Sequence, residues 1–252
     1  GDGRMMVEFA KLKRTKIVWL CLLMCAGIVL FSNMNLFAGD PIADFQADPH
    51  TQWASHLVGL GMALAFLTPL QLALVSSRIV DAEHASGGWR LNAIAGTRPG
   101  TLLSRKFAVA SLIVVVFTAL EFAAALALPV ALGAPAPSGA MVSTWLRFGL
   151  GALGTSIALL AVMLLLAAVV DSQIVVLGVG IVGGFLGVAA LLSPAWLAAL
   201  NPFGYFAVLL PFGFTESGVA PTQPGWWLWA AYLVLAAAVF IAGSRALDRK
   251  EI

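Results

Sequence analysis

The longest polar passage between two hydrophobic segments, residues 78–106, carries most of the side chains suited to chemistry or to binding. It contains five of the fourteen Lys and Arg residues of the chain, together with Glu83 and His84. Glu83 and Arg90 can form charge-assisted hydrogen bonds, and Trp89 is a large apolar side chain of the kind that anchors protein interfaces. This composition predicts an arm on which a partner protein acts; a solvated amphipathic loop is the alternative.

Two glycines and a proline divide this arm, which we define as residues 78–106. Gly87 and Gly88 permit a sharp turn directly before Trp89, and Pro99 prevents a preceding helix from running on. The sequence therefore predicts a short structural unit between two bends, positioned by the hydrophobic segments on either side.

One carboxylate, Glu121, lies inside a hydrophobic segment. It follows Lys106 by fifteen residues, or about 22 Å along a helix, which is the outer half of a hydrocarbon core about 30 Å thick. A charged carboxylate there costs about 3 kcal/mol unless it is paired, protonated or hydrated. Either Glu121 contacts substrate or water on a translocation path, or it holds helices together with Arg147 as its partner. Both interpretations predict that Glu121 points away from lipid.

Motifs for catalysis and for metal binding are missing from the sequence. It contains no GxxxxGK(S/T) phosphate loop, no HExxH, no CxxC pair and no GxSxG turn. Three scattered histidines do not build a metal site, and Cys21 and Cys25 are expected to be small buried residues. We expect no catalytic residue, no metal and no cofactor in this chain.

Composition identifies the class of protein. Hydrophobic residues make up 61% of the chain and charged residues 10%, against about 45–50% and about 25% in soluble domains. We predict an all-α integral membrane protein with six transmembrane helices in a single domain, residues 17–252, after a basic leader, residues 1–16. The spans are expected at about 17–37, 53–77, 107–131, 146–170, 174–192 and 226–246.

The basic residues set the expected orientation. With six spans, the leader, the arm and the tail share one side and hold thirteen of the fourteen Lys and Arg residues, leaving only Arg147. The positive-inside rule places that side, with both termini, in the cytoplasm. The leader itself, with Lys11, Lys13, Arg14 and Lys16, is either a short interfacial helix or a solvated basic segment.

Two further segments carry packing signals. The fifth span has two small-xxx-small patterns, which allow another helix to approach closely; they are formed by Gly180, Gly183, Gly184 and Gly187. Residues 194–224 are apolar but are interrupted by Pro202, Gly204, Pro211 and Gly213. We therefore predict one or two short re-entrant or interfacial helices before the sixth span.

The arm resembles the permease subunits of type-two ABC transporters, with most similarity to the branch of bacteriocin- and lantibiotic-immunity proteins and drug exporters. The resemblance is carried by EHASGGWRL at residues 83–91 and GTRPGTLLSRK at residues 96–106. Family members have an acidic residue, a glycine-rich turn and a run like PxxRxxLxxK after the second span. Here Gly100 and Thr101 stand where a basic residue often occurs. The six spans, the short turn between the fourth and fifth, and the basic tail agree with the family.

This resemblance implies a half-transporter in the bacterial inner membrane that pairs with itself or with a related permease. Separate ATPase subunits would bind ATP and Mg, and the arm would be a coupling helix seated on them. Cargo would be a hydrophobic or amphipathic peptide, drug or lipid moved out of the cytoplasm; nucleic acid is not an expected partner. The residues expected to couple to the ATPase are Glu83, His84, Gly87, Gly88, Trp89, Arg90, Arg98 and Pro99.

Two other functions remain open from the sequence. One is a membrane scaffold or a sensor that controls a partner without transport. The other is an ion-coupled secondary carrier that uses Glu121. Proton-driven uptake without ATP would distinguish the carrier from the ATP-driven exporter.

Overall fold

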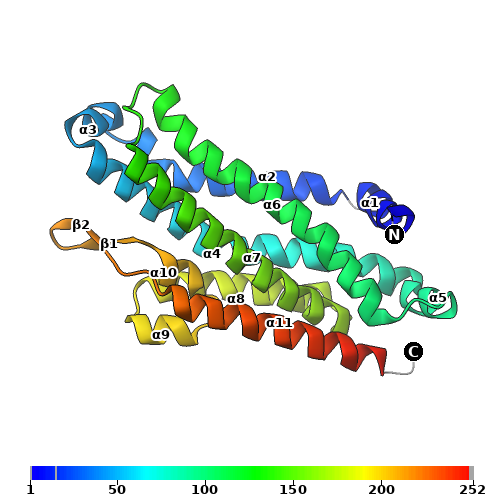
Figure 1. The fold of residues 1–252 in the computed structure, drawn as a ribbon. Coiled ribbons are helices and arrows are strands. Elements are labelled where there is room, and N and C mark those ends of the chain that lie inside the picture. Colours follow the sequence, from blue (N-terminus) through cyan, green and yellow to red (C-terminus); the bar gives the residue numbers. More distant parts are fainter. Residues whose placement is uncertain (1, 15, 250–252) are drawn as a thin grey trace.

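The computed structural model describes residues 2–14 and 16–249, whose long helices run roughly along one axis (Figure 1). Five of the described helices are long and apolar enough to cross a membrane, and α2 is a shorter apolar helix. The bundle consists of α2 (Ile17–Ser32), α4 (Pro49–Ser86), α6 (Pro99–Ala131), α7 (Gly139–Val169), α8 (Gln173–Leu191) and α11 (Trp226–Asp248). The predicted all-α membrane fold is therefore confirmed, and the six apolar helices fit six spans.

Several helices begin where the sequence supplies a capping side chain. The Asp40 carboxylate accepts a hydrogen bond from the Ala43 amide at the start of α3 (Pro41–Ala47). Asp48 does the same for the Thr51 amide at the start of α4. Each cap satisfies an amide that has no partner within its own helix. Two of the three acidic residues between the first two spans therefore cap helix starts.

The helix α4 is the centre of the bundle. It packs against α2, α7 and α8, and its most apolar window is two-thirds buried, the largest fraction of the five candidate spans. Pro69 lies inside α4 without ending it. The chain then leaves the core through α4 into the arm, so the arm is attached directly to the most buried helix.

The glycines of α8 lie where that helix meets its neighbours. A side chain on Gly180 would meet Ala73 and Leu70 of α4, and one on Gly184 would meet the carbonyl oxygen of Phe66. Because neither residue has a Cβ atom, the two backbones approach closely. Gly187 lies against the carbonyl oxygen of Ala65, and Gly183 lies against the ring of Phe203.

The segment before the last span combines short helices with a hairpin. The predicted short helices are α9 (Ala195–Leu200) and α10 (Tyr205–Leu209). A two-stranded antiparallel hairpin follows, β1 (Phe212–Thr215) and β2 (Gly218–Pro221), with Phe212 opposite Pro221. The hairpin was not predicted, because its four-residue strands are too short to show an alternating pattern.

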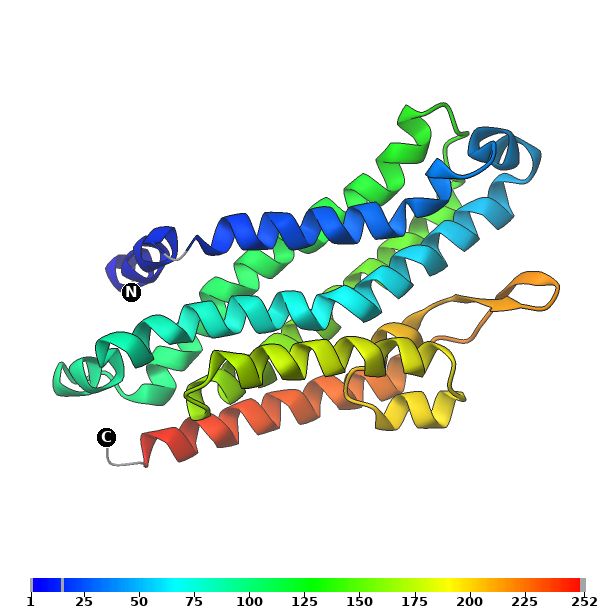
Figure 2. The ribbon, with the colours of Figure 1, turned by 180° about the vertical axis from the view of Figure 1, so that it is seen from behind.

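The two ends of the bundle differ in what they carry (Figures 1 and 2). One end holds α3 and the hairpin. The other holds α1 (Asp2–Arg14), the short helix α5 (Gly88–Ile94) and the last turn of α11. The start of α1 and the end of α11 therefore lie on the same side as the arm.

Candidate functional site

The arm is built from the end of α4, the helix α5 and the start of α6. The helix α4 ends at Ser86, and Gly87 follows it in the left-handed conformation with φ of 65°. A residue with a side chain is destabilised in that conformation, whereas glycine adopts it readily. Pro99 occupies the first position of α6, where its missing amide hydrogen is not needed. The two bends expected from the sequence thus turn the chain into α5 and out of it.

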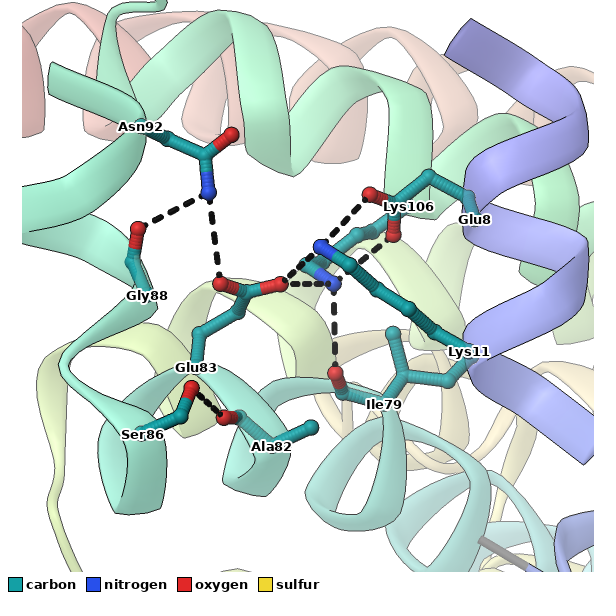
Figure 3. Close-up of polar contacts among 9 residues, drawn as sticks. All are labelled: Glu8, Lys11, Ile79, Ala82, Glu83, Ser86, Gly88, Asn92 and Lys106. Carbon is teal, nitrogen blue, oxygen red and sulfur yellow. Dashed lines mark hydrogen bonds and ion pairs between the residues drawn. The ribbon is translucent and has the colours of Figure 1, made fainter. Parts of the chain in front are cut away.

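A buried cluster of four charges lies at the root of the arm (Figure 3). The Lys106 ammonium of α6 is 2.9 Å from Glu8 Oε2 and 3.0 Å from Glu83 Oε1. Lys11 Nζ is 2.8 Å from Glu83 Oε1 and 3.1 Å from Glu8 Oε1. Two carboxylates and two ammonium groups therefore join α1, α4 and α6.

Further hydrogen bonds complete this charge cluster. Lys106 also donates to the carbonyl oxygen of Ile79 at 3.3 Å. The Asn92 side chain of α5 donates to Glu83 Oε2 at 3.5 Å and to the carbonyl oxygen of Gly88 at 2.8 Å. Lys106 is only 2% exposed. Removing either carboxylate would leave the cluster with one positive charge in excess, at a cost of about 3–5 kcal/mol. The cluster thus ties α5 to the bundle.

Lys11 is the most accessible member of the cluster. Partial burial tends to lower the pKa of its ammonium group, but hydrogen bonds to Glu83 and Glu8 outweigh this and raise the pKa above its ordinary value of 10.5. Lys11 is therefore held in its charged form. The leader helix α1 stays electrostatically linked to the arm across the neutral pH range.

The outward surface of the arm is apolar with a basic border. Leu91 is 62% exposed and Ile94 is 76% exposed. Arg90 and Arg98 are exposed as well. Large apolar side chains of α5 thus face outward at the end of the bundle, where a soluble partner could cover them.

Two residues expected to contact a partner face inward instead. Glu83 is buried in the charge cluster and is unavailable to a partner in this conformation. Trp89 is half-buried, and its ring centroid lies 6.0 Å from that of His84. The reason is geometric: Gly87 turns α5 back towards α4, so the first turn of α5 packs inward. Leu91 and Ile94 take the outward positions that the sequence suggested for Trp89.

His84 connects the arm to the turn between α7 and α8. Its Nε2 atom lies 2.9 Å from the carbonyl oxygen of Ala167, and its Nδ1 atom lies 3.7 Å from Asp171 Oδ1. The next residue, Ser172, occupies the N-cap position of α8. These groups line a small polar cavity of about 40 Å³, together with Asp81 and Gln173.

The last helix, α11, contacts the arm where the arm continues into α6. Asp248 of α11 accepts a hydrogen bond from the Gly100 amide at 2.8 Å. A side chain on Gly100 would collide with the carbonyl oxygen of Ser244. The absence of a side chain at Gly100 therefore allows the last helix, α11, to pack directly against the start of α6.

Glu121 lies inside the bundle, as expected, but not with the expected partner. It is 2% exposed and accepts a hydrogen bond from Gln71 Nε2 of α4 at 3.3 Å. Arg147 is exposed and lines a cavity with Thr144 and Gln223. The expected pairing of Glu121 with Arg147 is therefore wrong. The residue that faces α7, the helix of Arg147, is Phe122, which contacts the rings of Trp145 and Phe148.

Several residues of the site have no local signal in the sequence. Glu8 lies 98 positions before Lys106, and Lys11 lies 72 positions before Glu83. The one hint in the sequence is that positions 4–16 contain a single acidic residue, Glu8, together with five basic residues. Leu91, Ile94 and Asn92 become recognisable only once the direction of α5 is known.

Comparison with known protein families agrees with the arrangement of apolar membrane helices. Residues 5–187 match the family described as ABC-2 family transporter protein, from the leader helix through most of α8. No curated protein matches the sequence. The matched region contains the charge cluster, α5, the membrane helices α4, α6 and α7, and most of α8. The chain belongs to the ABC-2 transporter family, as a multi-pass membrane permease component of an ABC transporter.

Proposed function

We propose that this permease subunit moves a hydrophobic or amphipathic cargo out of the cytoplasm, driven by separate ATPase subunits that press on α5. The observation that carries this proposal is the outward apolar pair Leu91 and Ile94, bordered by Arg90 and Arg98. Large apolar side chains that are exposed side by side at the end of the bundle are suited to an interface that a partner covers. The proposed partner is an ATPase subunit, because ABC-2 permeases work with such subunits.

The charge cluster makes α5 suitable for transmitting force. A push on Leu91 and Ile94 acts on a helix whose Asn92 side chain bonds to Glu83. Glu83 belongs to α4, which is packed against α2, α7 and α8. Displacing α5 therefore displaces the central helix, and ATP binding at the partner shifts the population of permease conformations.

The orientation and the assembly belong to the same proposal. The basic leader, arm and tail support a cytoplasmic location for the α5 end by the positive-inside rule. In a bacterial inner membrane the α5 end would then meet soluble ATPase subunits. A second permease subunit, identical or related, would complete the translocation path. The apolar character of the bundle supports a hydrophobic or amphipathic cargo.

The proposal can be tested on the outward edge of α5. A variant with Leu91→Ala and Ile94→Ala should lower the affinity for the ATPase subunit by about tenfold or more, because two interface anchors are truncated. The control carries Leu192→Ala and Leu200→Ala, two equally exposed leucines at the opposite end of the bundle. Co-purification from native membranes and ATP-dependent transport in vesicles are the measurements. Unchanged association in the α5 variant would reject the proposed docking site.

Glu121 is the observation that would favour an ion-coupled carrier. It is a buried carboxyl group in α6, and Gln71 is its described hydrogen-bond donor. Membership of the ABC-2 family favours the ATP-driven function over this carrier and over a scaffold or sensor. Proton-driven uptake into vesicles without ATP, lost in Glu121→Gln, would reverse that preference.

A further inference from the structure

A polar cavity lies at the end of the bundle that carries the hairpin (Figure 1). Its volume is about 290 Å³, and it is enclosed by α7, the residues that follow α10 and the start of α11. Thr144 and Arg147 of α7 and Gln223, which precedes α11, supply its polar groups. Small-molecule sites in proteins begin at about 300 Å³, so the cavity has room for one small charged group.

Arg147 gives this cavity a positive charge. The other thirteen Lys and Arg residues of the sequence belong to the leader, the arm and the tail. Among the residues that the structure describes, Arg147 has no ion-pair partner. A cation at the edge of the hydrocarbon core is costly unless an anion or water stabilises it. The guanidinium group is therefore available to an anionic ligand.

The side chains around the cavity place it at a boundary of the membrane. Leu146, which precedes Arg147, is 58% exposed, and Leu150, almost one turn further along α7, is 69% exposed. Large apolar side chains exposed on a membrane helix face lipid. Trp226 lines the cavity, and its neighbour Trp227 is 75% exposed. Tryptophan is enriched where the hydrocarbon core meets the headgroups, which is the level of the lipid phosphates.

The cavity is apolar on the side that faces the middle of the bundle. Gly151 lies one turn beyond Arg147 on α7, and a side chain there would meet Leu209 and the ring of Trp226. These two side chains therefore pack directly on the α7 backbone, and Phe148 lines the cavity beside them. A charged group at the outer side with apolar surface beneath it matches a phospholipid, in which a phosphate is joined to acyl chains.

We propose that Arg147 and Gln223 bind the phosphate group of an anionic phospholipid at the membrane boundary remote from the arm. A guanidinium group can donate two parallel hydrogen bonds to a phosphate. The Thr144 hydroxyl already donates to the carbonyl oxygen of Ala140 at 3.0 Å, so the Gln223 amide is the second donor. The bound lipid joins α7 to the start of α11. Its assignment to the outer leaflet rests on the proposed orientation; the binding itself does not.

The binding is tested on the full chain in detergent micelles, without an ATPase. Native mass spectrometry measures the Kd of phosphatidylglycerol and of a diacylglycerol with the same acyl chains and no phosphate. Phosphatidylglycerol should bind about tenfold or more tightly than the diacylglycerol, because it alone offers a phosphate to Arg147. Equal affinities of the two lipids would overturn the proposal.

Substitutions of Arg147 identify the group that recognises the phosphate. Arg147→Gln should weaken the binding of phosphatidylglycerol by about tenfold or more and leave the diacylglycerol unchanged. Arg147→Lys keeps the charge but not the paired donors, so it should lose less. The matched control, Arg249→Gln, removes the same charge from an exposed position in the tail and should bind like the wild type. An equal loss in Arg147→Gln and Arg249→Gln would reject the site.

A free anion is the alternative source of the phosphate. Glycerol phosphate carries the same charged group without acyl chains, so it cannot use the apolar side of the cavity. It should bind about tenfold or more weakly than phosphatidylglycerol, because it buries little apolar surface. Glycerol phosphate that binds as tightly as the lipid would overturn the assignment to a phospholipid.

The place of binding is tested by labelling. A photoactivatable phosphatidylglycerol with its reactive group beside the phosphate should label the first half of α7 or the start of α11 in the wild type and in Arg249→Gln. The labelling should be lost in Arg147→Gln, and labelling confined to other helices would contradict the proposal. If the lipid binds as expected but no ATPase associates with the chain, the proposed function fails and the lipid site stands.

Discussion

Glu83 of α4 and Lys106 of α6 form an ion pair of 3.0 Å in which both side chains are almost completely buried. The pair brackets α5, because α5 and the bends on either side of it lie between these two residues of the arm. Lys106 also reaches Glu8, and Glu83 also reaches Lys11. Neither member of the pair can be removed without leaving charge in a place that water does not reach.

Removing Lys106 should therefore destabilise the protein strongly. Lys106→Met leaves Glu8 and Glu83 close together with Lys11 as their one remaining described cation, and we expect a loss of about 3–5 kcal/mol in the free energy of unfolding. Denaturant unfolding in detergent micelles measures this loss. Arg249→Met, an exposed substitution in the tail, is the control and should change stability by less than about 0.5 kcal/mol.

The members of the cluster should also be coupled to each other. Glu83→Gln combined with Lys106→Met should cost less than the sum of the two single changes, with a coupling energy of about 1–3 kcal/mol. The reason is that the second change removes a charge that the first has left unpaired. A double-mutant cycle measures the coupling, and strictly additive losses would contradict the cluster.

The link through Lys11 should fail at alkaline pH. Its pKa is raised above the ordinary value of 10.5, so its contribution to stability is complete below pH 10.5 and is lost as the pH rises through the folded-state pKa. The measurement is the unfolding free energy of wild type and Lys11→Arg from about pH 9 to about pH 12. Lys11→Arg should lose less stability over this range, because arginine stays protonated. Identical curves would contradict the prediction.

Hydropathy was sufficient to locate the spans and insufficient to locate the site. Lipid requires each crossing segment to be a continuous apolar helix, so the last span was expected at about 226–246 and is observed as Trp226–Asp248. The capped turns, the short helices before this span and the bend at Gly87 follow from local chemistry in the same way. These features depend on residues close together in the sequence.

The contacts of the arm depend on residues far apart in the sequence. Neighbouring residues of a helix point about 100° apart, so the choice between Glu121 and Phe122 as the residue facing α7 depends on helix rotation, which hydropathy does not fix. The outward position expected for Trp89 is wrong for the same reason. The direction of its side chain depends on how Gly87 turns α5, and hydropathy does not determine that turn. The pairing of Glu8 with Lys106 requires the leader to fold onto α6, and nothing local specifies that.

Glu121 provides a test of whether a charge is required inside the bundle. Glu121→Gln keeps the volume and an oxygen that accepts the hydrogen bond from Gln71, and we expect the unfolding free energy to change by less than about 1 kcal/mol. Gln71→Leu removes the donor and leaves the carboxyl group unsatisfied, which should cost about 1–3 kcal/mol. Unfolding of both variants in micelles makes the comparison. A large loss in Glu121→Gln alone would indicate a cation partner.

The close approach of α8 to α4 can be tested with a matched pair of glycines on one helix. A Cβ atom at Gly184 would collide with the carbonyl oxygen of Phe66, whereas one at Gly178 would have nothing within 4 Å. Gly184→Ala forces two packed backbones apart and should cost about 1–3 kcal/mol. Gly178→Ala should be neutral or stabilising by up to about 1 kcal/mol, since alanine favours the helix. Because both changes add the same methyl group to α8, helix propensity cancels in the comparison, and the difference between the two variants isolates the packing against α4. Equal unfolding free energies would show that α8 and α4 do not meet at Gly184.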